Sequence, residues 1–245
     1  MSALKVGCCG FAVGRPRYFK TLGLVEINIT FYQPPELSVV QRWRREAPAG
    51  FEFVVKAWQL ITHEAHSPTY RRLQEPLRPG EADLVGSFKL NRATLRAWDR
   101  TVAVTRALSA DKLLLQCPAS FRPSPENVDR LREFLGAVDR SGLTCLWEPR
   151  GPWPGDLMAR LCRELDLVHV VDPLKAAPVT AGLGYFRLHG IGGYDYRYSD
   201  EELARVAKRV SGHDPAYVLF NNSSEFDDAR RFEDLVVGPK QLSLL

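Results

Sequence analysis

The feature that most constrains the fold is a series of eight short apolar runs, each of which ends in polar side chains. The runs are LKVGC, LVEINITF, FEFVVKAW, KLLLQC, LTCLWE, VHVVD, YFRLHG and YVLFNN. Each is about as long as a buried strand, and most are rich in Val, Ile, Leu and Phe. Active sites of (β/α)8 barrels lie at the carboxyl ends of the strands, so apolar strands with polar ends are typical of that fold.

The segments between the runs carry helical patterns. Helices are predicted over residues 36–47, 91–109, 124–138, 155–166, 199–210 and 224–236. Asn91 and Ser124 are expected N-caps, and Ser224 with Asp227 has the spacing of a capping box. Strands that alternate with helices predict a parallel sheet, and eight such units favour its closure. The sequence therefore predicts an α/β fold, a TIM-type (β/α)8 barrel, and its 245 residues match the length of one barrel.

Two connections are too short to hold a full helix. These are GRPRYFKTLG after the first strand and PLKAAPVTAG, with two prolines, after the sixth. We therefore expect the helical ring to be incomplete after strands one and six. No linker or repeat divides the chain, so a single domain over 1–245 is predicted. Residues 63–90 lack periodicity and are expected to form a long excursion over the barrel top, as lids and binding loops do.

Composition narrows the classes of protein that the chain can belong to. The formal net charge is +4, and Lys and Arg are spread without a run of five, so charge alone does not indicate nucleic acid. The five cysteines include no C-x-x-C pair and are expected to be reduced thiols. No signal-peptide pattern and no apolar stretch of about 20 residues is present, so we predict a cytoplasmic protein without a membrane partner.

The second strand is expected to alternate polar and apolar side chains. In VEINITF, Glu26, Asn28 and Thr30 share one face, and Ile29 and Phe31 lie on the other. The polar face is expected to point into the barrel, with Asn28 and Thr30 near its mouth as ligand-binding residues. Glu26 lies deeper.

The last two strands favour an anion. Arg187 and His189 share a face of strand seven, and an inward arginine must meet either a ligand or one of the carboxylates Glu148 and Asp172. Gly190 opens a glycine-rich loop, and Asn221 and Asn222 end strand eight before a helix N-terminus. Loops after strands seven and eight form the common phosphate site of these barrels.

Strands three to six supply further ionisable ends. Lys56 ends strand three and is predicted to bind an anion, and His63 follows as a candidate general acid or base. Gln116 ends strand four. Glu148 and Arg150, two positions apart at the end of strand five, are expected to point to the same side. They either pair with each other or bind the ligand.

A metal site is not predicted at these strand ends. Glu148, Asp172 and His189 have suitable ligand atoms for a divalent cation, but Lys56, Arg150 and Arg187 oppose one. The balance of charge suits an anionic ligand, with or without one metal.

Seven motifs in order resemble the YecE-like family, domain of unknown function 72. They are VEINITFYQPP, FVVKAWQLITH, LLQCPASF, WEPR, Asp172, FRLHG and FNN, and the resemblance spans about residues 4–240. It implies a TIM-type barrel similar in shape to sugar isomerases and abasic-site endonucleases, without an established activity. The positions that match the family motifs are Glu26, Asn28, Thr30, Phe31, Tyr32, Lys56, Thr62, His63, Gln116, Pro118, Glu148, Arg150, Asp172, Arg187, His189, Gly190, Asn221 and Asn222.

The chain departs from the family pattern at three places. The opening Thr-Ser-Gly-Trp type segment is replaced by Cys8-Cys9-Gly10-Phe11. Gln-Leu-Pro-Pro has become Gln116-Cys117-Pro118-Ala119, and Gly151 replaces a histidine after Arg150. A mechanism that needs that histidine, or the opening serine or tryptophan, does not apply to this chain.

Three hypotheses for function follow. The first is a barrel enzyme or binder for an anionic small molecule that is phosphorylated or sugar-like. As an enzyme it would be an acid–base isomerase, lyase or hydrolase that uses Glu148, His189 and Lys56. His63 and Asp172 are further catalytic candidates. The expected ligand-binding residues are Asn28, Thr30, Tyr32, Gln116, Arg150, Arg187, Gly190, Asn221 and Asn222. The second is a nucleic-acid-processing or nucleic-acid-binding barrel similar to abasic-site endonucleases. The third is a non-catalytic ligand-binding protein.

Overall fold

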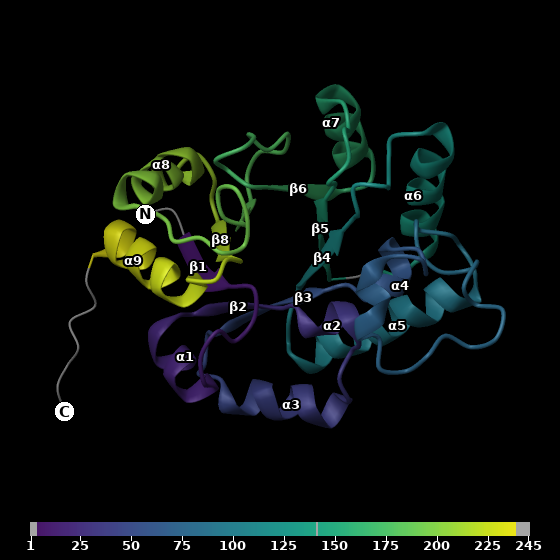
Figure 1. The fold of residues 1–245 in the computed structure, drawn as a ribbon, viewed down its shortest axis with the longest axis horizontal. Coiled ribbons are helices and arrows are strands. Elements are labelled where there is room, and N and C mark those ends of the chain that lie inside the picture. The colour runs from purple at the N-terminus through teal and green to yellow at the C-terminus, as the bar shows by residue number, and fades with distance from the viewer. Residues whose placement is uncertain (1–3, 141, 239–245) are drawn as a thin grey trace. The chain divides into compact units, whose positions relative to one another are not determined.

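The strands form a closed parallel barrel in chain order, as the sequence predicts (Figure 1). A computed structural model describes residues 4–140 and 142–238. The strands are β1 Leu4–Cys8, β2 Leu24–Ile27, β3 Glu52–Lys56, β4 Lys112–Gln116, β5 Thr144–Glu148, β6 Leu167–Val171, β7 Gly184–Leu188 and β8 Ala216–Phe220. β3 to β8 each end at, or one residue before, a polar side chain of the corresponding apolar run, and β2 ends one residue before Asn28.

Every predicted helix is present within two residues of its expected bounds. The helical elements are α1 Arg15–Thr21, α2 Ile29–Tyr32, α3 Leu37–Glu46, α4 Gln59–Thr62, the 3-10 helix η1 Pro68–Arg72, α5 Arg92–Ala107, α6 Pro125–Ala137, α7 Gly155–Glu164, α8 Asp200–Val210 and α9 Glu225–Val237. The side chains of Asn91, Ser124 and Ser199 accept backbone hydrogen bonds and cap α5, α6 and α8. Ser224 makes no such bond, so the predicted capping box at α9 is wrong.

The helical ring differs from expectation after the first strand. The segment that was predicted to be too short for a helix forms the seven-residue α1, with Pro16 in its first turn. Proline fits there because the first turn lacks intrahelical N–H partners. After β6 the prediction is confirmed: residues 172–183 form turns without a helix.

Two compact units are distinguishable. The first comprises Met1–Glu26, Gly50–Glu52 and Val170–Leu245, and the second comprises Ile27–Ala49 and Phe53–His169. The prediction of one domain over 1–245 stays a prediction. None of the helices in the described ranges has the length and apolar character that crossing a bilayer requires.

In the first unit, β1 pairs with both β2 and β8, and β8 pairs with β7. Helix α9 packs on β1 and β8. Tyr18 of α1 is fully buried, and its hydroxyl accepts the N–H of Cys8 and donates to the carbonyl of Leu24, both at 2.8 Å. One side chain of the ring thus joins the carboxyl end of β1 to the start of β2.

In the second unit, β3, β4 and β5 pair in sequence, and α5 packs against α3 and α4. The excursion at 63–90 returns to α4 through backbone bonds from Gly86 to Leu60 and from Phe88 to Ile61. A Cβ at Gly86 would lie 2.4 Å from the backbone of His63, so only glycine permits this approach. The excursion is therefore anchored directly beside His63.

Replacing Tyr18 with phenylalanine is expected to lower the free energy of unfolding by about 1–3 kcal/mol, because two buried strand groups lose their partner. Urea denaturation monitored by circular dichroism measures this. Tyr194→Phe, at a residue that is 62% exposed, is the control and should change little. Equal effects of the two substitutions would contradict the bridging role.

Candidate functional site

The end of β2 is not the alternating strand that the sequence predicts. β2 stops at Ile27, and α2 begins at Ile29. The Thr30 hydroxyl lies 2.6 Å from the carbonyl oxygens of Ile27 and Lys56, so the side chain closes the turn instead of facing a mouth. Asn28 occupies the N-cap position of α2 and is half-buried. Strand alternation fails here because it holds only for extended backbone.

The turn after β2 brings Phe31 beneath a buried ammonium group. Lys56 is 7% exposed at the end of β3, and its Nζ lies 4.1 Å from the centroid of the Phe31 ring. The same ring meets His63 edge-on at 4.8 Å between centroids. The sequence assigned Phe31 to the helix-facing side, whereas its ring supports the lysine through a cation–π contact.

His63 is held as a neutral imidazole. Its Nδ1 lies 2.8 Å from the Thr62 hydroxyl, and Tyr70 donates a hydrogen bond to its carbonyl oxygen. Burial, with the nearby charges of Lys56 and Arg150, lowers the pKa of His63 to about 3. His63 is therefore an uncharged hydrogen-bonding group at neutral pH.

Glu148 and Arg150 pair after β5, as one sequence interpretation expected. The Glu148 carboxylate is 3.1 Å and 3.2 Å from the Nη2 and Nε atoms of Arg150. Gln116 lies beside Glu148 in the neighbouring strand. Burial lowers the pKa of His169 to about 4, and the Glu148 charge opposes that shift. We call Lys56, His63, Gln116, Glu148 and Arg150 the β3–β5 cluster.

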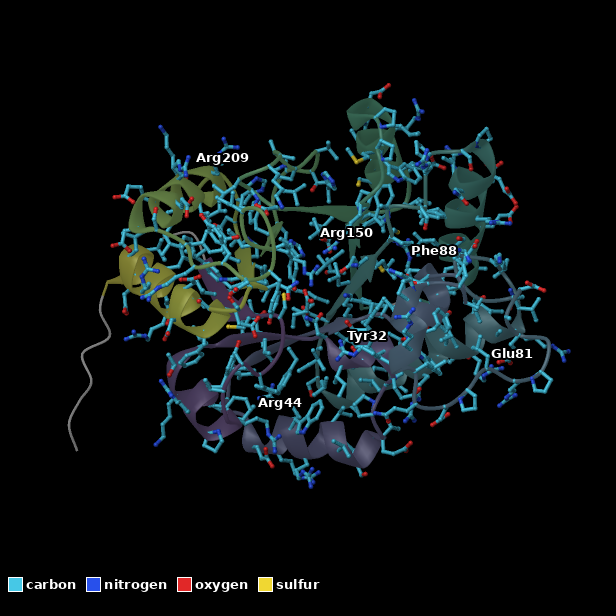
Figure 2. The ribbon with its side chains drawn as sticks, in the orientation of Figure 1. Tyr32, Arg44, Glu81, Phe88, Arg150 and Arg209 are labelled. Carbon is cyan, nitrogen blue, oxygen red and sulfur yellow. The ribbon has the colours of Figure 1, made fainter. Side chains whose placement is uncertain are left out.

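Tyr32 adds a stacking contact that sequence reasoning missed. Its carbonyl accepts hydrogen bonds from Trp58 and Gln59, and the Arg72 guanidinium lies 3.6 Å from its ring centroid. Tyr32 and Arg150, both in the second unit, are labelled in Figure 2. Gln59 lies within the FVVKAWQLITH motif, so the sequence offered a signal for it. Nothing in the sequence singles out Arg72.

In the first unit, Arg187 finds its anion in Glu26. Both side chains are fully buried, with Nη2–Oε1 at 2.8 Å and Nε–Oε2 at 3.0 Å. Tyr185 donates a third hydrogen bond to Glu26 at 2.8 Å. The expectation that Arg187 meets Glu148, Asp172 or a ligand is therefore corrected, since a carboxylate deep in β2 neutralises it.

Arg187 also fixes the proton on His189. Its Nη1 lies 3.2 Å from His189 Nε2. A guanidinium only donates, so Nε2 accepts and the neutral ring carries its proton on Nδ1. We call Glu26, Tyr185, Arg187 and His189 the β7 cluster.

Gly190 shapes the loop that follows the β7 cluster. Its φ is +81°, and a Cβ would come within 2.0 Å of the Gly193 carbonyl oxygen. Its N–H donates to the Tyr198 hydroxyl at 2.7 Å. Gly190 thus has a conformational role.

The remaining predicted residues of the first unit organise loops. Asp172 accepts the N–H of Leu174 and lies 3.4 Å from the Lys175 ammonium. The Asn221 N–H donates to the Leu188 carbonyl. The Asn222 amide donates to the Tyr196 carbonyl and to Asp228. Their predicted contacts with a ligand remain predictions.

No group of three His, Cys, Asp or Glu residues able to hold a metal ion occurs within 4–140 and 142–238. The polar strand ends instead gather as ion pairs and neutral histidines.

The DUF72 profile, described as a protein of unknown function, matches residues 15–242. The chain belongs to the DUF72 family. This confirms the YecE-like resemblance. No curated protein matches the chain significantly.

Solved structures of DUF72 proteins have the same fold. One from Enterococcus faecalis is 21% identical, with a TM-score of 0.73 over 97% of this chain and 98% of that one. One from Thermotoga maritima is 21% identical, with a TM-score of 0.70 over 96% and 99%. The protein called SacUVDE is similar at a TM-score of 0.58 and 6% identity, over 97% of this chain and 98% of that one.

The depressed pKa of His63 predicts a pH-dependent stability. Between pH 6.5 and about 3 the unfolded chain binds a proton that the folded state refuses, so stability falls as pH is lowered through this window. His63→Gln should remove a slope of up to about 1.4 kcal/mol per pH unit. Urea denaturation at pH 7, 6 and 5 measures it, with the exposed His66→Gln as control. Parallel curves for all three proteins would contradict the burial of a neutral imidazole.

Replacing Arg187 with leucine is expected to lower the free energy of unfolding by about 3–5 kcal/mol, because it leaves the Glu26 carboxylate buried without a cation. Glu26→Gln in the same chain should recover part of this loss, since glutamine still accepts from Tyr185. Arg205→Leu removes an exposed arginine of α8 as the control. If urea denaturation finds Arg187→Leu as mild as Arg205→Leu, the pair has no structural role.

Proposed function

We propose that this DUF72 protein binds a small anionic molecule at the β3–β5 cluster. The observation that carries the proposal is the charge of the cluster. Within the cluster, Lys56 and Arg150 contribute two formal positive charges and Glu148 contributes one formal negative charge. Burial, and then the charges of Lys56 and Arg150, lower the pKa of His63 to about 3, so it stays neutral.

The individual groups suit an anion that bears a phosphate or a carboxylate. An ammonium held over an aromatic ring is a fixed point charge, and Arg150 has a planar set of donors. Gln116 and His63 add uncharged hydrogen-bonding groups. The side chain of Arg150 is 39% exposed, so it is reachable by a ligand from solvent.

An acid–base reaction is the chemistry that these side chains support. Glu148 is a base once a ligand anion competes for Arg150, and Lys56 stabilises negative charge that develops in the substrate. We therefore propose an isomerase, lyase or hydrolase. The alternative of a ligand-binding protein without catalysis shares the same site.

A second candidate is a nucleic-acid-processing role. Arg71, Arg72 and Arg78 are exposed on the excursion, and Arg72 stacks on Tyr32. Stacked aromatic and guanidinium planes are common where single strands bind. The fold is also similar to a protein described as an AP endonuclease, family 2, from Brucella melitensis, at 11% identity and a TM-score of 0.51 over 91% of this chain and 93% of that one.

The location that we propose is the cytoplasm. All five cysteines are buried and free of disulfides. Unpaired thiols are the usual state in a reducing compartment.

Isothermal titration with inorganic phosphate, a sugar phosphate and a sugar carboxylate tests the anion site. We expect at least one to bind, and Lys56→Ala or Arg150→Ala to weaken it about tenfold or more, the loss of one charge-assisted hydrogen bond. Lys20→Ala removes an exposed lysine of the first unit as the matched control. No binding by the panel, or equal binding by all variants, would rule out this site.

A single-stranded oligonucleotide titrated at two salt concentrations separates the second candidate. Binding that weakens steeply with salt and is reduced in Arg72→Ala, but not in Lys56→Ala, favours nucleic acid.

A further inference from the structure

A cavity of about 420 Å³ lies in the first unit, and no residue of the β7 cluster lines it. The loop after β1, the Tyr194 loop and the first turn of α9 enclose it. Its lining includes Arg17, Tyr194, Ser224, Glu225, Phe226 and Asp227. The volume falls within the range of about 300–1,000 Å³ that small-molecule sites occupy.

Glu225 is the most unusual group of this cavity. Burial, and then the charge of Glu26, raise the pKa of Glu225 to about 8, while the Cys9 backbone lowers it by less. Within the part of the chain that the structure describes, no Lys or Arg forms an ion pair with it. At neutral pH its carboxyl group is therefore a hydrogen-bond donor as well as an acceptor.

Hydroxyl and aromatic groups complete the lining. The Ser224 side chain makes no capping bond, so its hydroxyl is available to a ligand. Tyr194 is 62% exposed and offers a ring face and a hydroxyl. Arg17 is held with its guanidinium carbon 5.2 Å from the Phe226 ring centroid.

The charges of the cavity cancel. Arg17 is positive, Asp227 is negative, and protonated Glu225 is uncharged. A charged ligand would be buried in this cavity without a net opposite charge to neutralise it. Many donors and acceptors around an aromatic face instead match a molecule that carries several hydroxyl groups.

We propose that this cavity binds an uncharged polyhydroxylated small molecule, a monosaccharide or polyol, with Glu225 and Ser224 as its hydrogen-bonding partners and Tyr194 as its stacking surface. The site is separate from the proposed anion site and does not depend on it.

The acidic first turn of α9 disfavours a phosphate at this helix end. Glu225, Asp227 and Asp228 all lie there. Ionised carboxylates of Asp227 and Asp228 already complement the positive end of the helix dipole. The acidic turn therefore disfavours the phosphate that the sequence predicted after strands seven and eight, and the cavity suits a neutral ligand.

Saturation-transfer NMR on the full chain with D-glucose, D-xylose, D-mannitol and myo-inositol tests the proposal. At least one is expected to bind, and Tyr194→Ala and Glu225→Ala should each weaken it about tenfold, the effect of one lost contact of about 1.4 kcal/mol. Glu225→Gln keeps an uncharged donor and acceptor and should bind within about threefold of the wild type.

Two controls keep the result interpretable. Glu201→Ala removes an exposed glutamate from the first turn of α8, and Lys56→Ala disables the proposed anion site; both should leave sugar and polyol binding unchanged. Circular dichroism verifies the fold of each variant. Failure of all four compounds to bind, unchanged binding in Tyr194→Ala and Glu225→Ala, or preference for glucose 6-phosphate over glucose in the Lys56→Ala variant overturns the proposal.

Discussion

The buried pair of Arg187 and Glu26 sets the electrostatics of the first unit. Two opposite charges without solvent contact need further hydrogen bonds to offset their lost hydration, and Tyr185 and His189 provide them. These contacts determine which atom donates and which accepts in each hydrogen bond of the group. Glu26 accepts from both of its donors, Arg187 donates throughout, and His189 is forced into a single neutral tautomer.

The influence of Glu26 extends beyond its direct contacts. Its negative charge contributes to keeping Glu225 protonated. For Tyr185, burial raises the pKa well above the ordinary value, and the charge of Glu26 raises it further. One carboxylate thus makes two neighbouring acids reluctant to ionise. In the β3–β5 cluster, burial is the main reason that the pKa of His63 is low, and the positive charges of Lys56 and Arg150 lower it further. Buried charge selects the protonation state of nearby groups in both units.

Much of the fold was predictable from the sequence because its signals are local and repeated. Apolar runs that end in polar residues give strands, and Asn91 and Ser124 cap helices as their local patterns predict, although Ser224 does not. The error at Asn28–Phe31 has a different origin. An alternating pattern there satisfies the rule for a strand, yet a tertiary hydrogen bond from Thr30 to the Lys56 carbonyl supports a helical turn.

The candidate residues were identified more reliably than their partners. Lys56, Glu148 and Arg187 stand out because a charged residue inside an apolar run is unusual. Their neighbours depend on side-chain direction and long-range register, which the sequence does not encode locally. The partner of Arg187 lies 161 positions away, and the cavity beside Glu225 joins segments from the two ends of the first unit.

The anchoring of the excursion beside His63 has an evolutionary consequence. Backbone bonds at Gly86 and Phe88 fix the returning end, and Tyr70 within the excursion donates to the His63 carbonyl. The residues between these contacts are free to change in length and composition, while the histidine keeps its place. Such a module lets selection alter what approaches the site without rebuilding the scaffold beneath it.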